Sequence, residues 1–138
     1  MKQLTVAVCV DERGGTLFAG RRQSRDRVLI ADFLEAAEGK TVCITPFSKL
    51  LFENAPNVCV CQELFEEAPD HAICFVEDVP LLLHLDQIET LILYHWNRHY
   101  PADRHLDLIP TEHGFSLVAT SEFVGSSHDK ITKEVYRK

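Results

Sequence analysis

The stretch from residue 72 to residue 95 reads AICFVEDVPLLLHLDQIETLILYH, and its pattern decides the fold class. An apolar run at 73–76 predicts a buried strand, residues 79–85 predict a short apolar helix, and residues 90–94 predict a second strand. The turn between a strand and a helix N-terminus is where α/β proteins commonly hold a nucleotide phosphate, using glycines and free backbone N–H groups. Here that turn carries Glu77 and Asp78 and no glycine. The stretch therefore predicts an α/β fold with a turn that is poorly suited to phosphate.

Length, charge and cysteine use restrict the class of protein. A chain of 138 residues with 46% hydrophobic residues is expected to form one soluble domain, residues 1–138. The net charge of −7 argues against general nucleic-acid binding, which needs a basic surface. No apolar run approaches the roughly 18 residues of a membrane span, and the first residues do not form a signal peptide. Five cysteines lie in apolar, strand-like runs, which indicates reduced thiols in a cytoplasmic protein.

The remainder of the chain alternates predicted strands with predicted helices. The almost wholly apolar run Leu4–Asp11 predicts a central strand that is covered on both faces, followed by a glycine-containing loop over 12–23. Ser24 is the expected N-cap of a first helix that runs to Ala37, and Pro46 is expected to open a second helix. Further strands are predicted at 41–45, 58–61, 89–96, 115–123 and 130–137, the last two as an antiparallel pair. These elements predict an α/β sheet of seven or eight strands.

The order of these parts resembles the dihydrofolate reductase fold family along nearly the whole chain. Residues 72–95 match, without a gap, the strand, triple-glycine turn, helix and strand of that family. Other similar segments are TVAVCVDERGG (5–15), GKTVCIT (39–45), PADRHLD (101–107), SLVATSEF (116–123) and ITKEVYRK (131–138). The resemblance implies a three-layer α/β/α fold with a mostly parallel central sheet and antiparallel C-terminal strands.

The cofactor-binding features of that family depart from its pattern in this chain. The triple-glycine turn that cradles the cofactor pyrophosphate becomes Val76-Glu77-Asp78, and a close pair of like charges costs about 1 to 4 kcal/mol at surface-like dielectrics. The family's Gly-Arg-x-Thr turn reads Thr45-Pro46-Phe47-Ser48, in which a proline removes a donor and no arginine is present. The family's strand beside the adenosine phosphate is expected to be absent, since Phe52 passes to Val58 within six residues.

The family's substrate acid has one candidate position. The Trp-x-x-Pro-x-Asp motif at the start of the family's first helix is replaced by residues 21–26, in which only Asp26 matches. The resemblance implies that Asp26 is the acid that binds a pterin ring. The alternative is a helix N-terminal carboxylate that is stabilised by the helix dipole.

Arginines form the first candidate binding cluster. In the resembled fold the loop and helix start that carry them border the substrate cleft, where a guanidinium suits a carboxylate or phosphate on a small ligand. The alternative is a solvated loop in which the arginines pair with Glu12, Asp26, Asp32 and Glu35. The cluster consists of Arg13, Arg21, Arg22, Arg25 and Arg27.

Histidines and aromatic residues form the second candidate cluster. Imidazole and carboxylate groups at short spacing can hold zinc, but two positions such as His95 and His99 lie about 13 Å apart along a strand. We therefore expect no metal site. Tyr94 and Trp96 share one face of their predicted strand, which suits a stacking wall for an aromatic ligand or, equally, a place in the core or in a dimer contact. The polar residues of the stretch are His95, His99, Asp103, His105, Asp107 and His113.

Together these features predict a divergent dihydrofolate reductase-like protein without NADPH-dependent reductase activity, which binds a small ligand or serves in an interaction. No cofactor, nucleic acid or membrane is expected as a partner. One alternative is an active NAD(P)H-dependent oxidoreductase acting on a pterin-like or other small heterocycle, and the other is an oligomeric scaffold such as a homodimer. The expected ligand-binding residues are Arg21, Arg22, Arg25, Asp26, Glu77 and Asp78.

Overall fold

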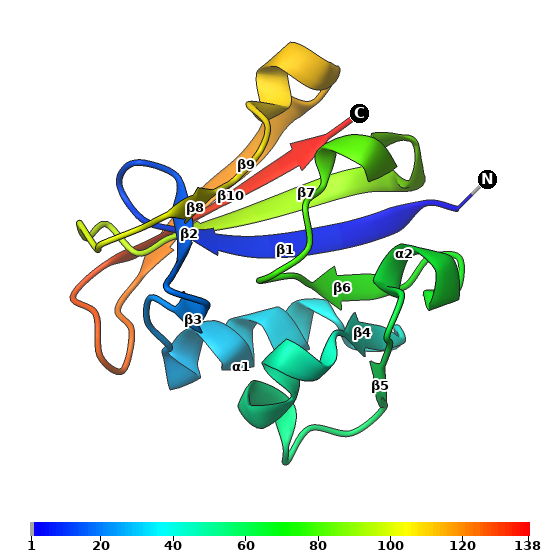
Figure 1. Cartoon of the computed structure of the whole chain (residues 1–138), viewed down its shortest axis with the longest axis horizontal. Helices are drawn as coiled ribbons and strands as arrows, with labels where there is room; N and C mark the ends of the chain where they lie inside the picture. Colours follow the sequence, from blue (N-terminus) through cyan, green and yellow to red (C-terminus); the bar gives the residue numbers. More distant parts are fainter. Residues whose placement is uncertain (1) are drawn as a thin grey trace.

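The computed structural model describes residues 2–138 (Figure 1). The strands are β1 (Leu4–Val10), β2 (Gly15–Phe18), β3 (Arg21–Arg22), β4 (Val42–Ile44), β5 (Val58–Val60), β6 (Ile73–Phe75), β7 (Ile88–His95), β8 (Arg104–His105), β9 (Ser116–Phe123) and β10 (Ile131–Arg137). The helices are α1 (Arg27–Ala36) and α2 (Leu64–Glu67), with 3₁₀ helices η1 (Pro46–Phe52), η2 (Leu82–Gln87) and η3 (Pro110–His113).

A seven-stranded sheet forms the centre of the molecule, in the order β5-β4-β6-β1-β7-β10-β9. The first five strands of that order run parallel, whereas β10 is antiparallel to both β7 and β9. The mostly parallel sheet with an antiparallel C-terminal pair is therefore confirmed. The connection from Phe52 to Val58 contains no strand, as the short spacing between these residues predicted.

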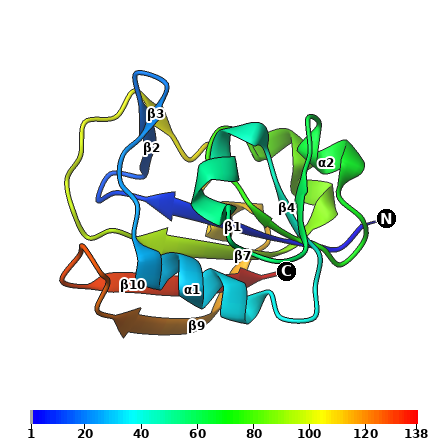
Figure 2. The same cartoon turned by 90° about the horizontal axis from the view of Figure 1, so that it is seen from below.

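Each face of the sheet buries its own apolar core, so the fold has three layers. On one face, α1 and η1 pack Leu29, Phe33 and Phe52 against Phe75 and other sheet residues (Figure 2). On the opposite face, α2 and the segments around η2 and η3 cover β1, β6 and β7 through a second cluster that includes Leu64, Leu81 and Phe115. The strongly apolar sequences of β1 and β7 follow from this cover on both sides.

Asp26, not Ser24, is the N-cap of α1, which corrects the predicted start of this helix. The Asp26 carboxylate accepts hydrogen bonds from the backbone N–H groups of Val28 and Leu29. The residues before it are extended, because Arg21 and Arg22 form β3, which pairs with β2 in a small second sheet completed by β8. The loop predicted over 12–23 therefore contains two short strands.

The helix predicted to open at Pro46 and the helix predicted at 79–85 are both 3₁₀ helices, η1 and η2. The helix expected at 79–85 lies at Leu82–Gln87 instead. It lacks a local N-cap side chain, and its first N–H groups are bonded by a distant residue, since Asp107 accepts from the backbone of Leu81 and Leu82 at 2.9 to 3.1 Å. Contacts that are remote in sequence thus set the start of this helix. Across residues 2–138, every helix is too short or too polar to cross a bilayer.

Candidate functional site

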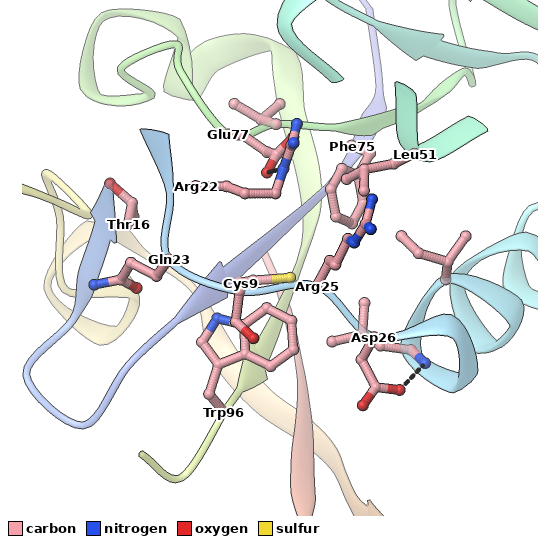
Figure 3. A pocket seen from close by; sticks show the side chains of 14 residues that line it. Cys9, Thr16, Arg22, Gln23, Arg25, Asp26, Leu51, Phe75, Glu77 and Trp96 are labelled. Atoms are coloured by element: carbon pink, nitrogen blue, oxygen red, sulfur yellow. Dashed lines mark hydrogen bonds and ion pairs between the residues drawn. The ribbon is translucent and has the colours of Figure 1, made fainter. Parts of the chain in front are cut away.

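Glu77, in the turn after β6, is bound by an arginine from β3. The Arg22 guanidinium makes two hydrogen bonds to the Glu77 carboxylate, at 2.9 and 3.0 Å, in a bidentate arrangement (Figure 3). Ser48 donates to the same carboxylate at 2.7 Å. Arg22 also donates to the Phe47 carbonyl at 2.9 Å, and its guanidinium lies over the Phe47 ring. A planar guanidinium suits this set of acceptors, so the charges of Arg22 and Glu77 satisfy each other.

Asp78 is held by the turn at residues 45–48, which also contains Ser48. The Thr45 hydroxyl donates to the Asp78 carboxylate at 2.8 Å, and Arg104 donates to the Asp78 backbone carbonyl at 3.2 Å. Thr45 and Ser48 are both buried. The two turns that the resemblance associates with cofactor phosphates are therefore joined to each other by side-chain hydrogen bonds.

Asp26 is fully occupied by hydrogen bonds within the protein. Besides capping α1, its carboxylate accepts from the backbone N–H groups of Ser126 and Ser127, both at 2.9 Å, in the β9–β10 hairpin. His128 Nδ1 lies 2.9 Å from the same carboxylate, and both side chains are almost completely inaccessible to solvent. Burial by itself raises the pKa of Asp26, but the hydrogen bonds from Ser127, His128 and Ser126 outweigh it and hold the pKa well below its usual value.

His128 was not identified as a functional candidate from the sequence, yet both of its ring nitrogens have side-chain partners. Its Nε2 atom lies 3.1 Å from Ser24 Oγ and 3.0 Å from the Tyr100 hydroxyl. Its ring stacks on Trp96 with centroids 4.5 Å apart. The only local signal was a histidine in a serine-rich hairpin, which is common in exposed turns, so pairing across 102 residues had no sequence signature.

A small cavity lies beneath the segment that joins β3 to α1, and we call it the inner cavity. Its lining residues include Cys9, Phe75, Glu77 and Trp96 (Figure 3). Ser24 lines it as well. Its volume of about 20 Å³ is close to the space of a single water molecule. Burial, then the nearby Glu77 and Asp26 carboxylates, raise the pKa of the Cys9 thiol, so this thiol stays protonated at neutral pH.

A larger depression opens beside the inner cavity, and we call it the outer groove. It has a volume of about 590 Å³ and lies between the start of α1, the end of η1 and the β9–β10 hairpin. Its lining residues are Arg25, Asp26, Arg27, Ile30, Leu50, Leu51, Ser126 and Ser127.

The predicted binding residues thus have four different placements. Arg22, Glu77 and Asp78 join the two turns, and Asp26 anchors the hairpin. Arg25 lines the outer groove, whereas Arg21 is exposed on β3. Within residues 2–138, no carboxylate lies within 4.0 Å of the cationic groups of Arg21, Arg25 or Arg27. The alternative in which these arginines pair with nearby acids is therefore not observed.

The histidine-rich stretch is dispersed by the fold. His95 bonds to Glu134 at 2.6 Å, while His99 and His105 are exposed. Between Lys2 and Lys138, no group of three or more histidine, cysteine, aspartate or glutamate side chains is arranged to hold a metal ion. Tyr94 and Trp96 are buried in the core on the α1 face, and Trp96 also borders the inner cavity.

Comparison with known proteins identifies the fold. No protein-family model matches the chain, and no curated protein matches it. Among solved structures, the chain is similar to dihydrofolate reductase from Enterococcus faecalis complexed with NADP(H) and RAB-propyl, with a TM-score of 0.70. The two share 12% sequence identity, and the match covers 98% of this chain and 95% of that one. The chain therefore has a dihydrofolate reductase-like fold.

Proposed function

We propose that this protein binds a small anionic ligand in the outer groove and does not carry out NADPH-dependent reduction. The observation that carries the proposal is the link between the turn at residues 45–48 and the turn at residues 76–78. Arg22 and Ser48 donate to the Glu77 carboxylate, and Thr45 donates to the Asp78 carboxylate. In an active reductase of this fold these turns would present donors to a dinucleotide. Here the donors are already used by carboxylates of the protein.

The electrostatics of the turn at Glu77 and Asp78 also argue against binding of a dinucleotide. A hollow of about 270 Å³ borders it, and three carboxylates lie along its wall, those of Glu77, Asp78 and Asp107. A pyrophosphate placed there would face negative charge, and it could gain the Arg22 guanidinium only by breaking the bidentate Arg22–Glu77 pair. Arg104 and His105 also line this hollow, but both belong to an exposed strand rather than to a preorganised donor turn.

The reductase alternative also lacks a free substrate acid. Asp26 would have to present an oxygen to a heterocycle, yet its carboxylate accepts from four backbone N–H groups and from His128. Releasing one of these contacts would leave a buried donor without a partner, which costs about 1 to 3 kcal/mol. The structure therefore favours the predicted alternative role of Asp26 as a helix cap.

Anion binding is supported by the positive charge of the outer groove. Arg25 and Arg27 are both exposed and free of carboxylate partners within residues 2–138. Ser126 and Ser127 also line the groove, where Ser126 Oγ accepts from the Arg27 backbone N–H and the Ser127 hydroxyl donates to the Arg25 carbonyl. The Asp26 carboxylate also lines the groove, and its oxygens are occupied by donors of the protein. A carboxylate or phosphate can bridge the two guanidinium groups, since charge-assisted hydrogen bonds to Arg are among the stronger polar contacts.

A homodimer is a second proposal, which a different observation favours. Strand β9 is an edge strand of the central sheet, and seven of its eight residues are exposed, including Leu117 at 49% and Val118 at 53%. Long exposed edges with apolar side chains pair with other chains. Light scattering over a concentration series tests this, with the variant Val118→Lys as the monomeric control.

Thermal unfolding with simple anions tests the main proposal. We expect inorganic phosphate or glutarate to raise the Tm more than chloride does at equal ionic strength, because ligand bound only to the folded state stabilises it by about 2.7 kcal/mol at 100 times its Kd. The double variant Arg25→Gln/Arg27→Gln should lose this increase, whereas Arg13→Gln/Arg21→Gln should keep it. Equal shifts in all salts, or an unchanged response in the first variant, would refute anion binding in the groove.

A further inference from the structure

Three side chains near the inner cavity have the relative positions of a nucleophile, a base and an orienting acid. Ser24 Oγ lies 3.1 Å from His128 Nε2, and His128 Nδ1 lies 2.9 Å from Asp26 Oδ2. These distances fall within hydrogen-bond reach for a serine, a histidine and an aspartate that act in sequence. Such arrangements are recognised by geometry rather than by chain order, and here the order is serine, aspartate, histidine.

The environment of His128 fixes which nitrogen can act as a base. Asp26 accepts from Nδ1, so the proton of the neutral ring resides on that nitrogen. The Nε2 lone pair then faces the hydroxyl groups of Ser24 and Tyr100. Asp26 remains ionised because five further donors hold its charge. The face of the ring stacks on Trp96 with the centroids 4.5 Å apart. The base is therefore oriented by contacts at both ring nitrogens and on its face.

Ser24 lies at the inner cavity, next to the outer groove. It is half-buried and lines the inner cavity together with Asp26, and the following residue, Arg25, lines both the inner cavity and the outer groove. His128 is buried. The backbone N–H of Arg25, the residue after Ser24, makes no hydrogen bond to any group of residues 2–138. In serine hydrolases with a strand-to-helix nucleophile turn, the N–H of the residue after the nucleophile contributes to oxyanion stabilisation. Ser24 likewise lies between a strand, β3, and a helix, α1.

We propose that Ser24, His128 and Asp26 form a catalytic triad that hydrolyses small carboxylic esters. Ser24 Oγ attacks the ester carbonyl carbon and forms a C–O bond while its proton passes to His128 Nε2. The tetrahedral intermediate collapses, the bond to the leaving alcohol breaks, and the alcohol takes the proton from Nε2. A water molecule then repeats the sequence on the acyl-serine, which releases the acid and restores Ser24. Asp26 is a positioning residue that keeps the imidazole in the required tautomer.

Esters that carry a second, anionic group are the preferred substrates, a refinement that rests on the proposed anion binding. Arg25 is adjacent to Ser24 in sequence and lines both the inner cavity and the outer groove. An ester whose carbonyl reaches Ser24 would therefore place a carboxylate on its acyl chain near the guanidinium groups of the groove.

Two measurements on the full chain test the triad. The first is labelling with a fluorophosphonate, followed by mass analysis of the labelled peptide. The second is hydrolysis of 4-nitrophenyl acetate and of the 4-nitrophenyl monoester of glutaric acid. We expect the label on Ser24, and we expect Ser24→Ala and His128→Asn to lower kcat/KM at least about 100-fold. Ser121→Ala, on the exposed strand β9, is the matched control and should retain full activity.

The variants are chosen so that loss of folding is not mistaken for loss of chemistry. Ser24→Ala removes one half-buried oxygen, and its Tm should remain near that of the unmodified protein. Asn at position 128 keeps an N–H donor for Asp26 but has no basic nitrogen. Absence of the label from Ser24, or equal hydrolysis by Ser24→Ala and the unmodified protein, would overturn the triad.

The two proposals fail separately. If Arg25→Gln/Arg27→Gln keeps both the phosphate-dependent rise in Tm and full hydrolysis of both esters, anion binding in the groove is refuted while the triad stands. If Ser24→Ala still shows the phosphate-dependent rise in Tm but no change in hydrolysis, the triad is refuted while anion binding stands.

Discussion

Replacement of Asp26 by asparagine should be the most damaging conservative substitution in this chain. The Asp26 carboxylate joins the start of α1 to the β9–β10 hairpin, with donors from Leu29, Ser126, Ser127 and His128. Asparagine has nearly the same shape, but its NH₂ group would face N–H donors and its charge is zero. A buried donor left without its acceptor costs about 1 to 3 kcal/mol, and hydrogen bonds to a charged acceptor are at the upper end of that range. We expect a loss of that size at pH 7, out of a total stability of about 5 to 15 kcal/mol.

The pH dependence of this loss provides an independent check. The pKa of Asp26 in the folded protein lies below its unfolded value of about 3.9. The contribution of a group with a lowered folded pKa is complete above the unfolded pKa and decreases as the pH falls toward the folded pKa. The difference in unfolding free energy between the unmodified protein and Asp26→Asn should therefore be constant from pH 7 to about pH 5 and should shrink below about pH 4.

Urea unfolding followed by tryptophan fluorescence measures both the loss of stability at pH 7 and its dependence on pH. Trp96 is the single tryptophan and stacks on His128, so its emission reports on the same region. The replacement Asp129→Asn, an exposed position in the same hairpin, is the control and should change the stability by less than about 0.5 kcal/mol. The anchoring role of this carboxylate would be refuted by a loss of stability under about 1 kcal/mol for Asp26→Asn at pH 7. It would also be refuted if the difference in unfolding free energy between the two proteins increased as the pH falls.

Two further substitutions test neighbouring contacts. Arg22→Ala should destabilise the protein by about 1 to 3 kcal/mol, since it removes the donor of the Phe47 carbonyl and leaves Ser48 as the side-chain donor to Glu77. A double-mutant cycle with Glu77→Ala should give a coupling of at least about 0.5 kcal/mol in urea unfolding, and additive effects would contradict the pairing. Gly125→Ala should lower the free energy of unfolding by about 1 to 3 kcal/mol, because the added methyl carbon would lie 2.8 Å from the Asp26 carboxyl carbon and 2.9 Å from Ile131 Cδ1. An unchanged Tm would contradict this close packing of the hairpin.

The fold was predictable from the sequence because its main signals are local and repeated. The apolar runs of β1 and β7 predict strands buried on both faces, and the order of segments identified the dihydrofolate reductase-like arrangement. Helix boundaries were less predictable. Ser24 and Asp26 are both good N-cap residues, and the choice between them depends on the hairpin residues Ser126 and Ser127, which are about 100 positions away.

The candidate site was predictable in composition but not in connectivity. The sequence indicated that Glu77 and Asp78 stand where glycines are expected, and it grouped Arg22 with the other arginines. It did not indicate that Arg22 binds Glu77, since that pairing joins residues 55 positions apart. His128 was missed for the same reason, because only the folded hairpin brings it to Asp26.

Titration calorimetry with NADPH tests the central claim most directly, namely that the linked turns at Glu77 and Asp78 exclude a dinucleotide. The protein should show no saturable heat up to about 1 mM NADPH, whereas a cofactor-binding dihydrofolate reductase treated in the same way provides the positive control. Saturable binding with a Kd near 1 μM, equivalent to about −8.2 kcal/mol, would contradict the account.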